Sequence, residues 1–457
     1  MSEASNGDAN EMSDAVDATL MMSPAGVPGF RWLMLYRILT LLSYQMVAVT
    51  VGWHVYELTG DPWSLGLVGL AEVIPYFCVA PFAGHLVDNL PRRKLGAAAC
   101  IGLAVTAGAL ALIAAHDVGV DHLWTIYAAI AVGGIGRSFL GPVYNALFAR
   151  ALKREQFARG ASMGSVIFQT GLVLGPALGG VLIGVAGKSW TYGLAATFAI
   201  AAAIAVVRMP VTEPPLQLQR GPVLASIGEG LRFVFGHQIL LAALALDMFA
   251  VLLGGAISLA PAFIKDVLHA GPEALGILRG APAVGSVMVA LILSRWPLQA
   301  NAGRIMLAAV AGFGACMIGF GLSTALWLSV CFLLLSGVFD GISVVLRSTI
   351  LQLATPDEMR GRVSSVNGLF ISSSNELGAF YAGSMARLLG MVTSVVLGGC
   401  VTIGIVGITA LKAPKLCPEV PRKCRVIGAS SMPWLPCARA MVPDRRAPML
   451  RSVLWIR

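Results

Sequence analysis

The sequence predicts an all-α membrane protein with twelve transmembrane helices in two pseudo-symmetric six-helix halves. Of its 457 residues, 57% are hydrophobic and 12% are charged, and the mean hydropathy is +0.80. A soluble domain carries about 25% charged residues. Apolar stretches of the length that crosses a bilayer as a helix, about 20 residues, recur along the chain. The later stretches also repeat features of the earlier ones, which predicts two related halves.

The apolar stretches define the predicted spans. Six precede a polar connector that holds four prolines, and six follow it. The least certain boundaries separate the ninth span from the tenth and the eleventh from the twelfth, where the loops are short. The predicted spans are 31–57, 65–87, 95–115, 123–149, 161–186 and 191–207, then 239–263, 273–293, 304–323, 325–353, 363–389 and 391–411.

Five regions follow from this division. Residues 1–30, with five acids and no base, are predicted to be a disordered cytoplasmic N-terminus. Residues 31–207 form one six-helix half, 208–237 the cytoplasmic connector and 238–411 the second half. Residues 412–457 form a basic, irregular tail that carries a net charge of +8. The tail either binds anionic lipid or is a nonfunctional extension from a changed reading frame.

The loops between the predicted spans differ in charge. Fourteen Lys and Arg residues fall in one alternating set of loops and three in the other set. Cytoplasmic loops carry the excess of basic residues. This asymmetry predicts a multi-pass protein of the inner (plasma) membrane, with both termini and the connector in the cytoplasm.

An internal repeat supports the two halves. A shift of 203 residues places Arg159 on Arg362 and Ser162 on Ser365. The same shift aligns three pairs of glycines, Gly134 with Gly337, Gly175 with Gly378 and Gly180 with Gly383. Such a parallel repeat is typical of two halves that are related by an axis along the membrane normal.

Seven ionisable residues fall within predicted spans and are candidates for a proton or substrate pathway. Charge inside hydrocarbon is costly, so such residues usually face a cavity or a partner. The acids are candidate proton carriers, but structural ion pairs, helix capping and snorkelling of the arginines are alternatives. The candidates are Arg37, Glu72, Arg137, Asp247, Asp340, Arg347 and Glu376.

Three short motifs, one in a helix and two in loops, support a more specific hypothesis. The second and third spans are joined by a tight basic loop that includes Gly84, Asp88, Arg92 and Arg93. The fifth span carries small residues at a spacing that permits close helix packing, with a proline that bends the helix. These are Gly171, Gly175, Pro176, Gly179 and Gly180. The loop before the eleventh span holds Asp357, Arg360, Gly361 and Arg362.

These motifs resemble the major facilitator superfamily. The resemblance implies that the first motif is a charge latch between the halves on the cytoplasmic side. Asn89 and Pro91 stand where the family usually has Arg and Gly. The second motif resembles the family's antiporter signature. The segment 356–367, followed by 374–378, resembles the enterobactin-exporter branch, which implies export of a siderophore or another small molecule.

The resulting hypothesis is a secondary active transporter, a proton-coupled antiporter that exports a siderophore or a drug-like amphiphile by alternating access. An importer or facilitator of the same fold and a nontransporting scaffold or receptor are the alternatives. No phosphate-binding loop, catalytic triad or metal-ligand cluster is present, which predicts a protein that is not an enzyme and uses no cofactor or metal. The expected partners are a small molecule, protons and the lipid bilayer but no nucleic acid. The sequence does not predict the oligomeric state.

Overall fold

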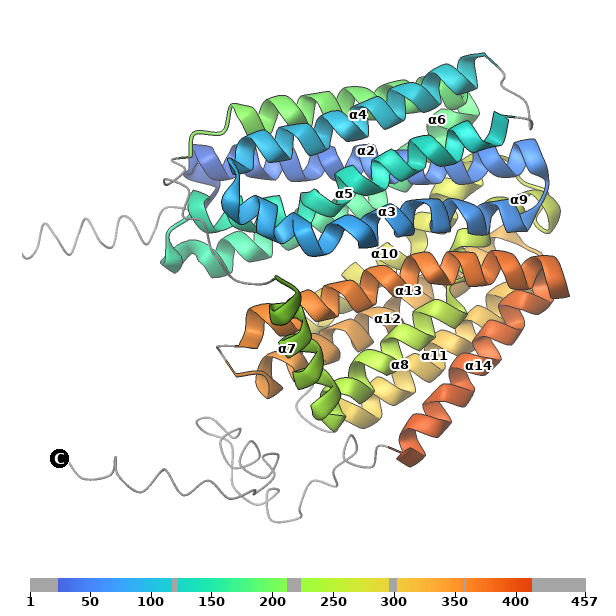
Figure 1. Cartoon of the computed structure of the whole chain (residues 1–457). Coiled ribbons are helices and arrows are strands. Elements are labelled where there is room, and N and C mark those ends of the chain that lie inside the picture. Colours follow the sequence, from blue (N-terminus) through green and yellow to red (C-terminus); the bar gives the residue numbers. More distant parts are fainter. Residues whose placement is uncertain (1–23, 117–121, 212–222, 296–301, 357–358, 413–457) are drawn as a thin grey trace, which may run out of the picture. The chain divides into compact units, whose positions relative to one another are not determined.

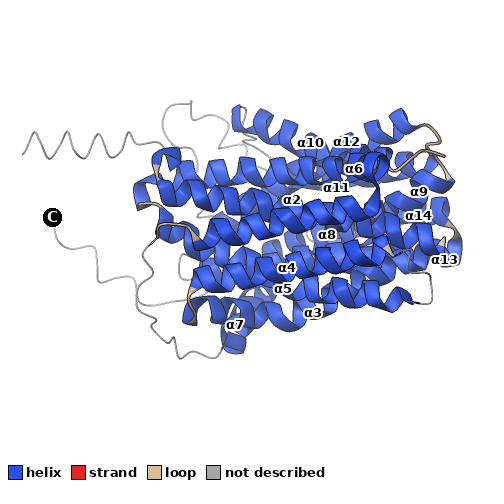
Figure 2. Cartoon of the chain, turned by 90° about the horizontal axis from the view of Figure 1, so that it is seen from above, coloured by secondary structure: helices blue, strands red, loops and turns tan. Residues whose placement is uncertain are grey.

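The computed structural model describes residues 24–116, 122–211, 223–295, 302–356 and 359–412, and in these ranges the chain is helical without strands. The basic tail beyond residue 412 and residues 1–23 of the N-terminus predicted to be disordered (1–30) lie outside the described residues. Residues 24–30 are instead ordered: Pro24–Gly26 form a 3-10 turn and α2 begins at Pro28, where Gly29 and Phe30 are buried. The helices are α2 (Pro28–Thr59), α3 (Pro62–Asn89), α4 (Arg92–Ala115), α5 (Leu123–Ala151), α6 (Phe157–Val207), α7 (Val223–Gly236), α8 (Gln238–Gly254), α9 (Ala260–Asp266), α10 (Glu273–Arg295), α11 (Ala302–Leu322), α12 (Leu326–Ala354), α13 (Arg360–Leu389) and α14 (Met391–Lys412) (Figure 1). Seen from above, the long helices run side by side as a bundle (Figure 2).

Ten helical stretches among the described residues are long and apolar enough to cross a membrane. One of them, Arg159–Val207, contains both the fifth and the sixth predicted spans. Two helices meet at a kink within it, because the backbone of Gly187 is not helical and has a φ of 83°. Helix α13 covers the eleventh predicted span but is not among the ten, since it carries six serines, two asparagines and Glu376. The fold class of the prediction is confirmed, whereas the count of twelve spans remains a prediction.

The seventh predicted span differs from a single helix. Helix α8 ends at Gly254, a short 3-10 turn covers Ala256–Leu259, and α9 continues from Ala260. Pro261 lacks a backbone N–H and is best tolerated in the first turn of a helix, which favours a new helix start at this point. The span therefore bends near the end of the bundle.

The bundle has two ends. The end where α2 ends and α3 begins is called here the Asp61 end, and the opposite end, where α7 lies, is called the α7 end (Figure 1). At the Asp61 end, Gly60 adopts a left-handed conformation with a φ of 60° and closes α2. The Asp61 carboxylate then caps α3 by accepting a hydrogen bond from the Trp63 backbone nitrogen at 3.0 Å. Both features are common helix stop and start signals.

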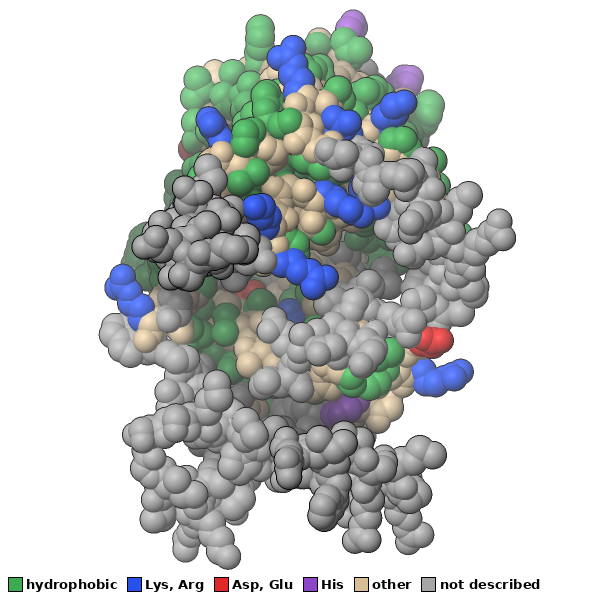
Figure 3. Space-filling view, turned by 90° about the vertical axis from the view of Figure 1, so that its left-hand side faces the viewer, with side chains coloured by type: hydrophobic (Ala, Val, Ile, Leu, Met, Phe, Trp, Pro, Cys, Tyr) green, Lys and Arg blue, Asp and Glu red, His purple; other side chains and the backbone are tan. Residues whose placement is uncertain are grey.

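The α7 end is the basic end of the described chain. Basic residues begin α4 and border the turn between α5 and α6, and they include Arg92, Arg93, Lys94, Arg150 and Lys153. Figure 3 shows this face, where Lys and Arg side chains are more frequent than Asp and Glu among the described residues. Helix α7 packs at this end against α8 and α13, and its buried Val234 belongs to one apolar cluster with Leu240 of α8 and Val363 of α13.

The two halves touch at two equivalent glycine pairs. A methyl group placed on Gly180 of α6 would lie 2.5 Å from the backbone nitrogen of Gly276 in α10. A methyl group on Gly383 of α13 would lie 2.8 Å from the backbone nitrogen of Gly66 in α3. Gly180 and Gly383 are 203 residues apart, and Gly66 and Gly276 are 210 apart. The same close backbone crossing therefore occurs twice, as two pseudo-symmetric halves require.

The Asp61 end of this interface is apolar and closely packed. One buried cluster contains residues of both halves, such as Val49 and Ile183 from the first and Leu275, Phe263 and Phe320 from the second. The rings of Phe263 and Phe320 have centroids 4.5 Å apart, and both side chains are fully buried. The two halves are therefore in close apolar contact at this end.

Candidate functional site

The first half pairs two of the predicted in-span charges. Arg137, near the middle of α5, donates a hydrogen bond to Glu72 Oε1 of α3 at 2.6 Å. The Arg137 guanidinium also lies 4.3 Å from the ring centroid of Tyr44 and 5.7 Å from that of Tyr76. Glu72 and Tyr44 line a cavity within this half. Pairing lowers the cost of placing both charges inside the membrane.

Arg37 of α2 lies nearer the α7 end of the same half. Its guanidinium carbon is 3.7 Å from the ring centroid of Tyr144 in α5 and 5.3 Å from that of Phe168 in α6. Such cation–π contacts are common for arginine. The Arg37 Nε atom is buried and has no hydrogen-bond partner among the described residues.

The second half pairs two other predicted charges. Asp247 of α8 and Arg347 of α12 form an ion pair, and their side chains are only 8% and 6% exposed. This pair is more deeply buried than the Glu72–Arg137 pair, whose side chains are 13% and 24% exposed. Removing one partner would leave an uncompensated charge inside the bundle.

Asp340 lies near the middle of α12 and shares a cavity with Asp247. Ser343, Phe313 and Phe339 also line this cavity. Within the described ranges, no cation pairs with Asp340 and no side chain donates a hydrogen bond to it. Asp340 thus differs from Glu72 and Asp247, which both pair with an arginine.

The structure describes part of the predicted latch. Gly84 lies in the last turns of α3, and the Asp88 side chain lies outside the described residues. Arg93 donates a hydrogen bond from Nη1 to the backbone oxygen of Met209 at 3.0 Å, within the same half. Arg92 is partly buried at the start of α4. The latch itself remains a prediction.

The predicted antiporter-like motif lies at two helix contacts. Gly171, Gly175 and Gly179 face Leu41, Gln45 and Met46 of α2, whereas Gly180 faces Gly276 of the other half. Pro176 lies inside α6. Because a side chain at Gly171, Gly175 or Gly180 would collide with α2 or α10, these three glycines determine how closely both helices approach α6. The role of the motif in antiport stays a prediction.

The remaining predicted residues lack described side chains. Asp357 lies outside the described residues altogether, and Arg360, Gly361 and Arg362 form the first turn of α13. The side chains of Arg360 and Arg362, like that of Glu376 further along α13, are not described. No group of three His, Cys, Asp or Glu side chains in the described ranges converges on a metal position.

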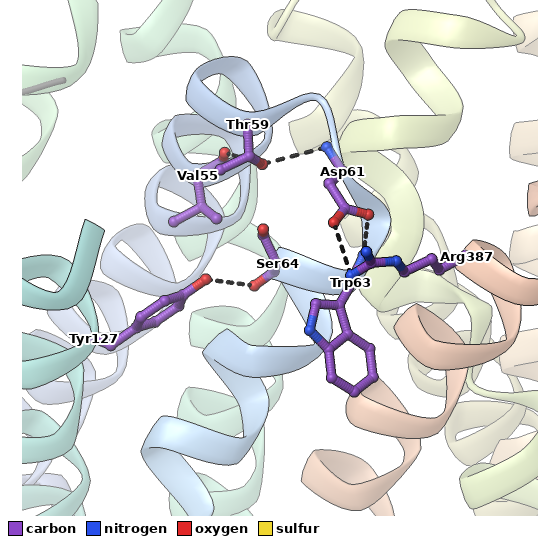
Figure 4. Close-up of polar contacts among 7 residues, drawn as sticks. All are labelled: Val55, Thr59, Asp61, Trp63, Ser64, Tyr127 and Arg387. Atoms are coloured by element: carbon purple, nitrogen blue, oxygen red, sulfur yellow. Dashed lines mark hydrogen bonds and ion pairs between the residues drawn. The ribbon is translucent and has the colours of Figure 1, made fainter. Parts of the chain in front are cut away.

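Sequence reasoning missed a set of polar contacts at the Asp61 end. Arg387 of α13 lies 3.4 Å from the Asp61 carboxylate of the other half, and the Tyr127 hydroxyl donates to the Ser64 backbone oxygen (Figure 4). Nearby, the Tyr56 hydroxyl donates to Asp266 across the two halves. In the sequence, these residues lie at or near the ends of predicted spans, where polar side chains are common. The signal available in the sequence was the Asp-Pro helix start at Asp61, which fixes a carboxylate at this end.

Comparisons with known proteins place this geometry in context. The sequence model of the Major Facilitator Superfamily matches residues 33–379. Enterobactin exporter EntS of Citrobacter koseri is 28% identical over 390 residues, which cover 81% of this chain and 88% of that protein. Enterobactin exporter EntS of Shigella boydii serotype 18 is 27% identical over 385 residues, which cover 80% and 87%.

Solved structures show the same fold at lower sequence identity. A bacterial homolog of the human lysosomal transporter Spinster, in an inward-facing and unoccupied conformation, matches with a TM-score of 0.69 at 13% identity, over 86% of this chain and 98% of that one. A POT family transporter in complex with 5-aminolevulinic acid matches with a TM-score of 0.68 at 11% identity, over 87% and 99%.

Proposed function

This chain belongs to the Major Facilitator Superfamily, and we propose that it is a proton-coupled antiporter that exports a small molecule across the inner membrane. It is a multi-pass membrane transporter and not an enzyme. Export is supported by the similarity to proteins named enterobactin exporters. A siderophore is therefore the most specific substrate class, followed by a drug-like amphiphile.

The observation that carries proton coupling is the isolation of Asp340. A carboxylate without a cation partner can take up and release a proton without breaking an ion pair. Glu72 and Asp247 are committed to ion pairs, whereas Asp340 shares a cavity without a described cation partner. Asp340 is the candidate that exchanges a proton during the cycle. The energy source is the proton gradient, and no cofactor is required.

The distribution of charge supports an orientation for this function. The α7 end carries the basic loops, so it faces the cytoplasm, with both termini on that side. The apolar packing of the two halves at the Asp61 end supports a state that is closed on the side opposite the cytoplasm. Alternating access then requires the halves to separate at the Asp61 end and to close at the α7 end. Asp88, Arg92 and Arg93 would form the latch in that opposite state.

Transport in inverted membrane vesicles tests the proposal. Respiration acidifies the lumen, and siderophores and cationic dyes are offered outside, at the former cytoplasmic face. We expect at least one compound to accumulate in the lumen and an uncoupler to abolish its accumulation. Asp340→Asn should abolish gradient-driven accumulation as well. Glu57→Gln, which removes an exposed carboxylate paired with Lys188, is the matched control and should retain it.

The outcomes separate the alternatives. Transport that ignores the gradient and Asp340→Asn would indicate a facilitator, and accumulation only in right-side-out vesicles would indicate an importer. If no compound moved in either orientation, a nontransporting scaffold or receptor would be favoured. A finding that Glu72→Gln and not Asp340→Asn removes the coupling would overturn the assignment of the proton to Asp340.

A further inference from the structure

Helices α2 and α5 carry a reciprocal pair of arginine–tyrosine contacts. The α2 helix supplies Arg37 and Tyr44, and the α5 helix supplies Arg137 and Tyr144. Arg37 lies over the ring of Tyr144, and Arg137 lies over the ring of Tyr44. In each helix the arginine precedes the tyrosine by seven residues, which is two turns or about 10 Å. Because the helices are antiparallel, the two contacts form successive steps, called here the arginine–tyrosine ladder.

Each step has a second aromatic wall from a third helix. Phe168 of α6 lies beside Arg37, with its ring centroid 5.3 Å from the guanidinium carbon. Tyr76 of α3 lies beside Arg137 at 5.7 Å. Each guanidinium is therefore bordered by aromatic rings from two helices. Flat cations and flat rings at these spacings can stack with a third planar group.

A purely structural role would be to join α2 and α5, but three observations indicate a binding surface. Arg137 lies near the middle of the span and is still 24% exposed, and Phe168 is 38% exposed. Tyr44 lines the cavity of this half. Arg37 Nε is a buried donor without a partner among the described residues. An arginine in a membrane span with exposed surface faces water or a ligand more readily than lipid.

The equivalent positions of the second half form a different contact, which is fully paired and buried. Arg37 and Tyr144 correspond to Asp247 and Arg347 under the shifts of 210 and 203 residues that relate the glycine contacts. In the second half these positions form a buried ion pair. In the first half the ladder holds two arginines. Among the described residues, one carboxylate, that of Glu72, pairs with one of them, Arg137. The ladder thus keeps an excess of positive charge beside partly buried tyrosine rings and the exposed ring of Phe168.

We propose that the arginine–tyrosine ladder binds aromatic anions, that is, compounds with a flat ring that carries a carboxylate or an ionised phenol. The ring stacks on Tyr44, Tyr144 and Phe168, and the anionic group accepts hydrogen bonds from the guanidinium groups, which match a carboxylate in geometry. Arg37 forms the step nearer the α7 end, and Arg137 forms the step at mid-span. The inference rests on the proposed function only in naming the cargo, since binding needs neither a gradient nor a direction.

Three related probes separate the contributions of ring and charge. Naphthoate has both, cyclohexanecarboxylate has the charge without the ring, and naphthylmethylammonium has the ring with the opposite charge. Their binding to the full-length protein in lipid nanodiscs is measured by calorimetry, with empty nanodiscs as the background. We expect naphthoate to bind at least about tenfold more tightly than either other probe, because stacking and the charge-assisted hydrogen bonds act together.

Variants then locate the site. Arg37→Gln, which leaves the Glu72–Arg137 pair intact, should remove the preference for naphthoate over naphthylmethylammonium. The double variant Tyr44→Leu/Tyr144→Leu should weaken naphthoate about tenfold, whereas Tyr44→Phe/Tyr144→Phe should preserve its affinity, because the ring is kept. Tyr127→Leu removes a tyrosine of the same half outside the ladder and is the matched control, with unchanged naphthoate affinity.

Each result supports or overturns the inference. Equal binding of all three probes, or a naphthoate affinity that is unchanged in Arg37→Gln and in the double leucine variant, would overturn it. Proton-driven efflux of some compound together with such a result would leave the proposed function standing and remove only the ladder. Naphthoate binding that depends on the ladder, without gradient-driven transport of any compound, would support the ladder and overturn the proposed function.

Discussion

The two halves place different chemistry at equivalent positions. The contact between α2 and α5 is an arginine against a tyrosine ring, Arg37 with Tyr144. The equivalent contact between α8 and α12 is the ion pair of Asp247 and Arg347. Arg137 of the first half likewise corresponds to Asp340 of the second, 203 residues later. The backbone crossings, in contrast, are conserved between the halves as glycine pairs.

This difference shows which features the repeated fold requires and which are adapted in each half. Two pseudo-symmetric halves need the same close backbone approach, so both keep glycine at the crossing. The side chains that face the interior need not match, and a transporter benefits when they do not. In the proposed function, the arginine–tyrosine ladder of the first half handles the cargo and Asp340 of the second half handles the proton.

The largest expected effect comes from breaking the buried pair of the second half. Arg347→Gln leaves Asp247 charged without its partner and should lower the free energy of unfolding by about 3–5 kcal/mol. Arg137→Gln should cost less, because Glu72 and Arg137 are more exposed. Unfolding of both variants in mixed micelles by denaturing detergent measures the difference. Asp247→Asn/Arg347→Gln is the control and should recover much of the loss. Equal losses in the two single variants would contradict the contrast between the halves.

A smaller effect is expected at the glycine crossings, where the halves are alike. Gly180→Ala and Gly383→Ala each place a methyl group against the backbone of the other half. Overpacking of this kind costs about 1–3 kcal/mol, and the two losses should be similar. Gly193→Ala of α6 has no neighbour within 4 Å of the added group and should not destabilise the protein. Thermal unfolding in detergent checks all three. A loss at only one crossing would show that the halves do not share this contact.

The sequence predicted the fold class and the in-span charges well, because both depend on local composition. Glu72, Arg137, Asp247 and Arg347 stood out as charges in apolar stretches. Their pairing could not be predicted, since it depends on how α3, α5, α8 and α12 are rotated and packed.

The two tyrosines of the ladder were missed for a related reason. In a sequence, an aromatic residue inside a span reads as core or lipid-facing. The repeated spacing of an arginine and a tyrosine seven residues apart, in both α2 and α5, was present. It becomes informative only when the structure shows that the two helices are antiparallel neighbours.

Breaking the Asp61–Arg387 contact should have the smallest effect on stability. It tests whether this ion pair controls the opening of the Asp61 end or only adds to the stability of the fold. Its side chains are 35% and 58% exposed, and exposed ion pairs contribute about 0–1 kcal/mol, which salt screens further. Arg387→Gln should therefore leave the unfolding temperature within error. Because the pair joins the halves only when the Asp61 end is closed, the variant should still shift the population toward states open at that end. Labelling of an introduced cysteine, Trp63→Cys, by a membrane-impermeant maleimide added on the side that the Asp61 end faces should be faster in Arg387→Gln, and the difference should shrink at high salt. Unchanged labelling at low salt would mean that the apolar cluster that joins Val49 and Ile183 to Leu275, and not this ion pair, holds the Asp61 end closed.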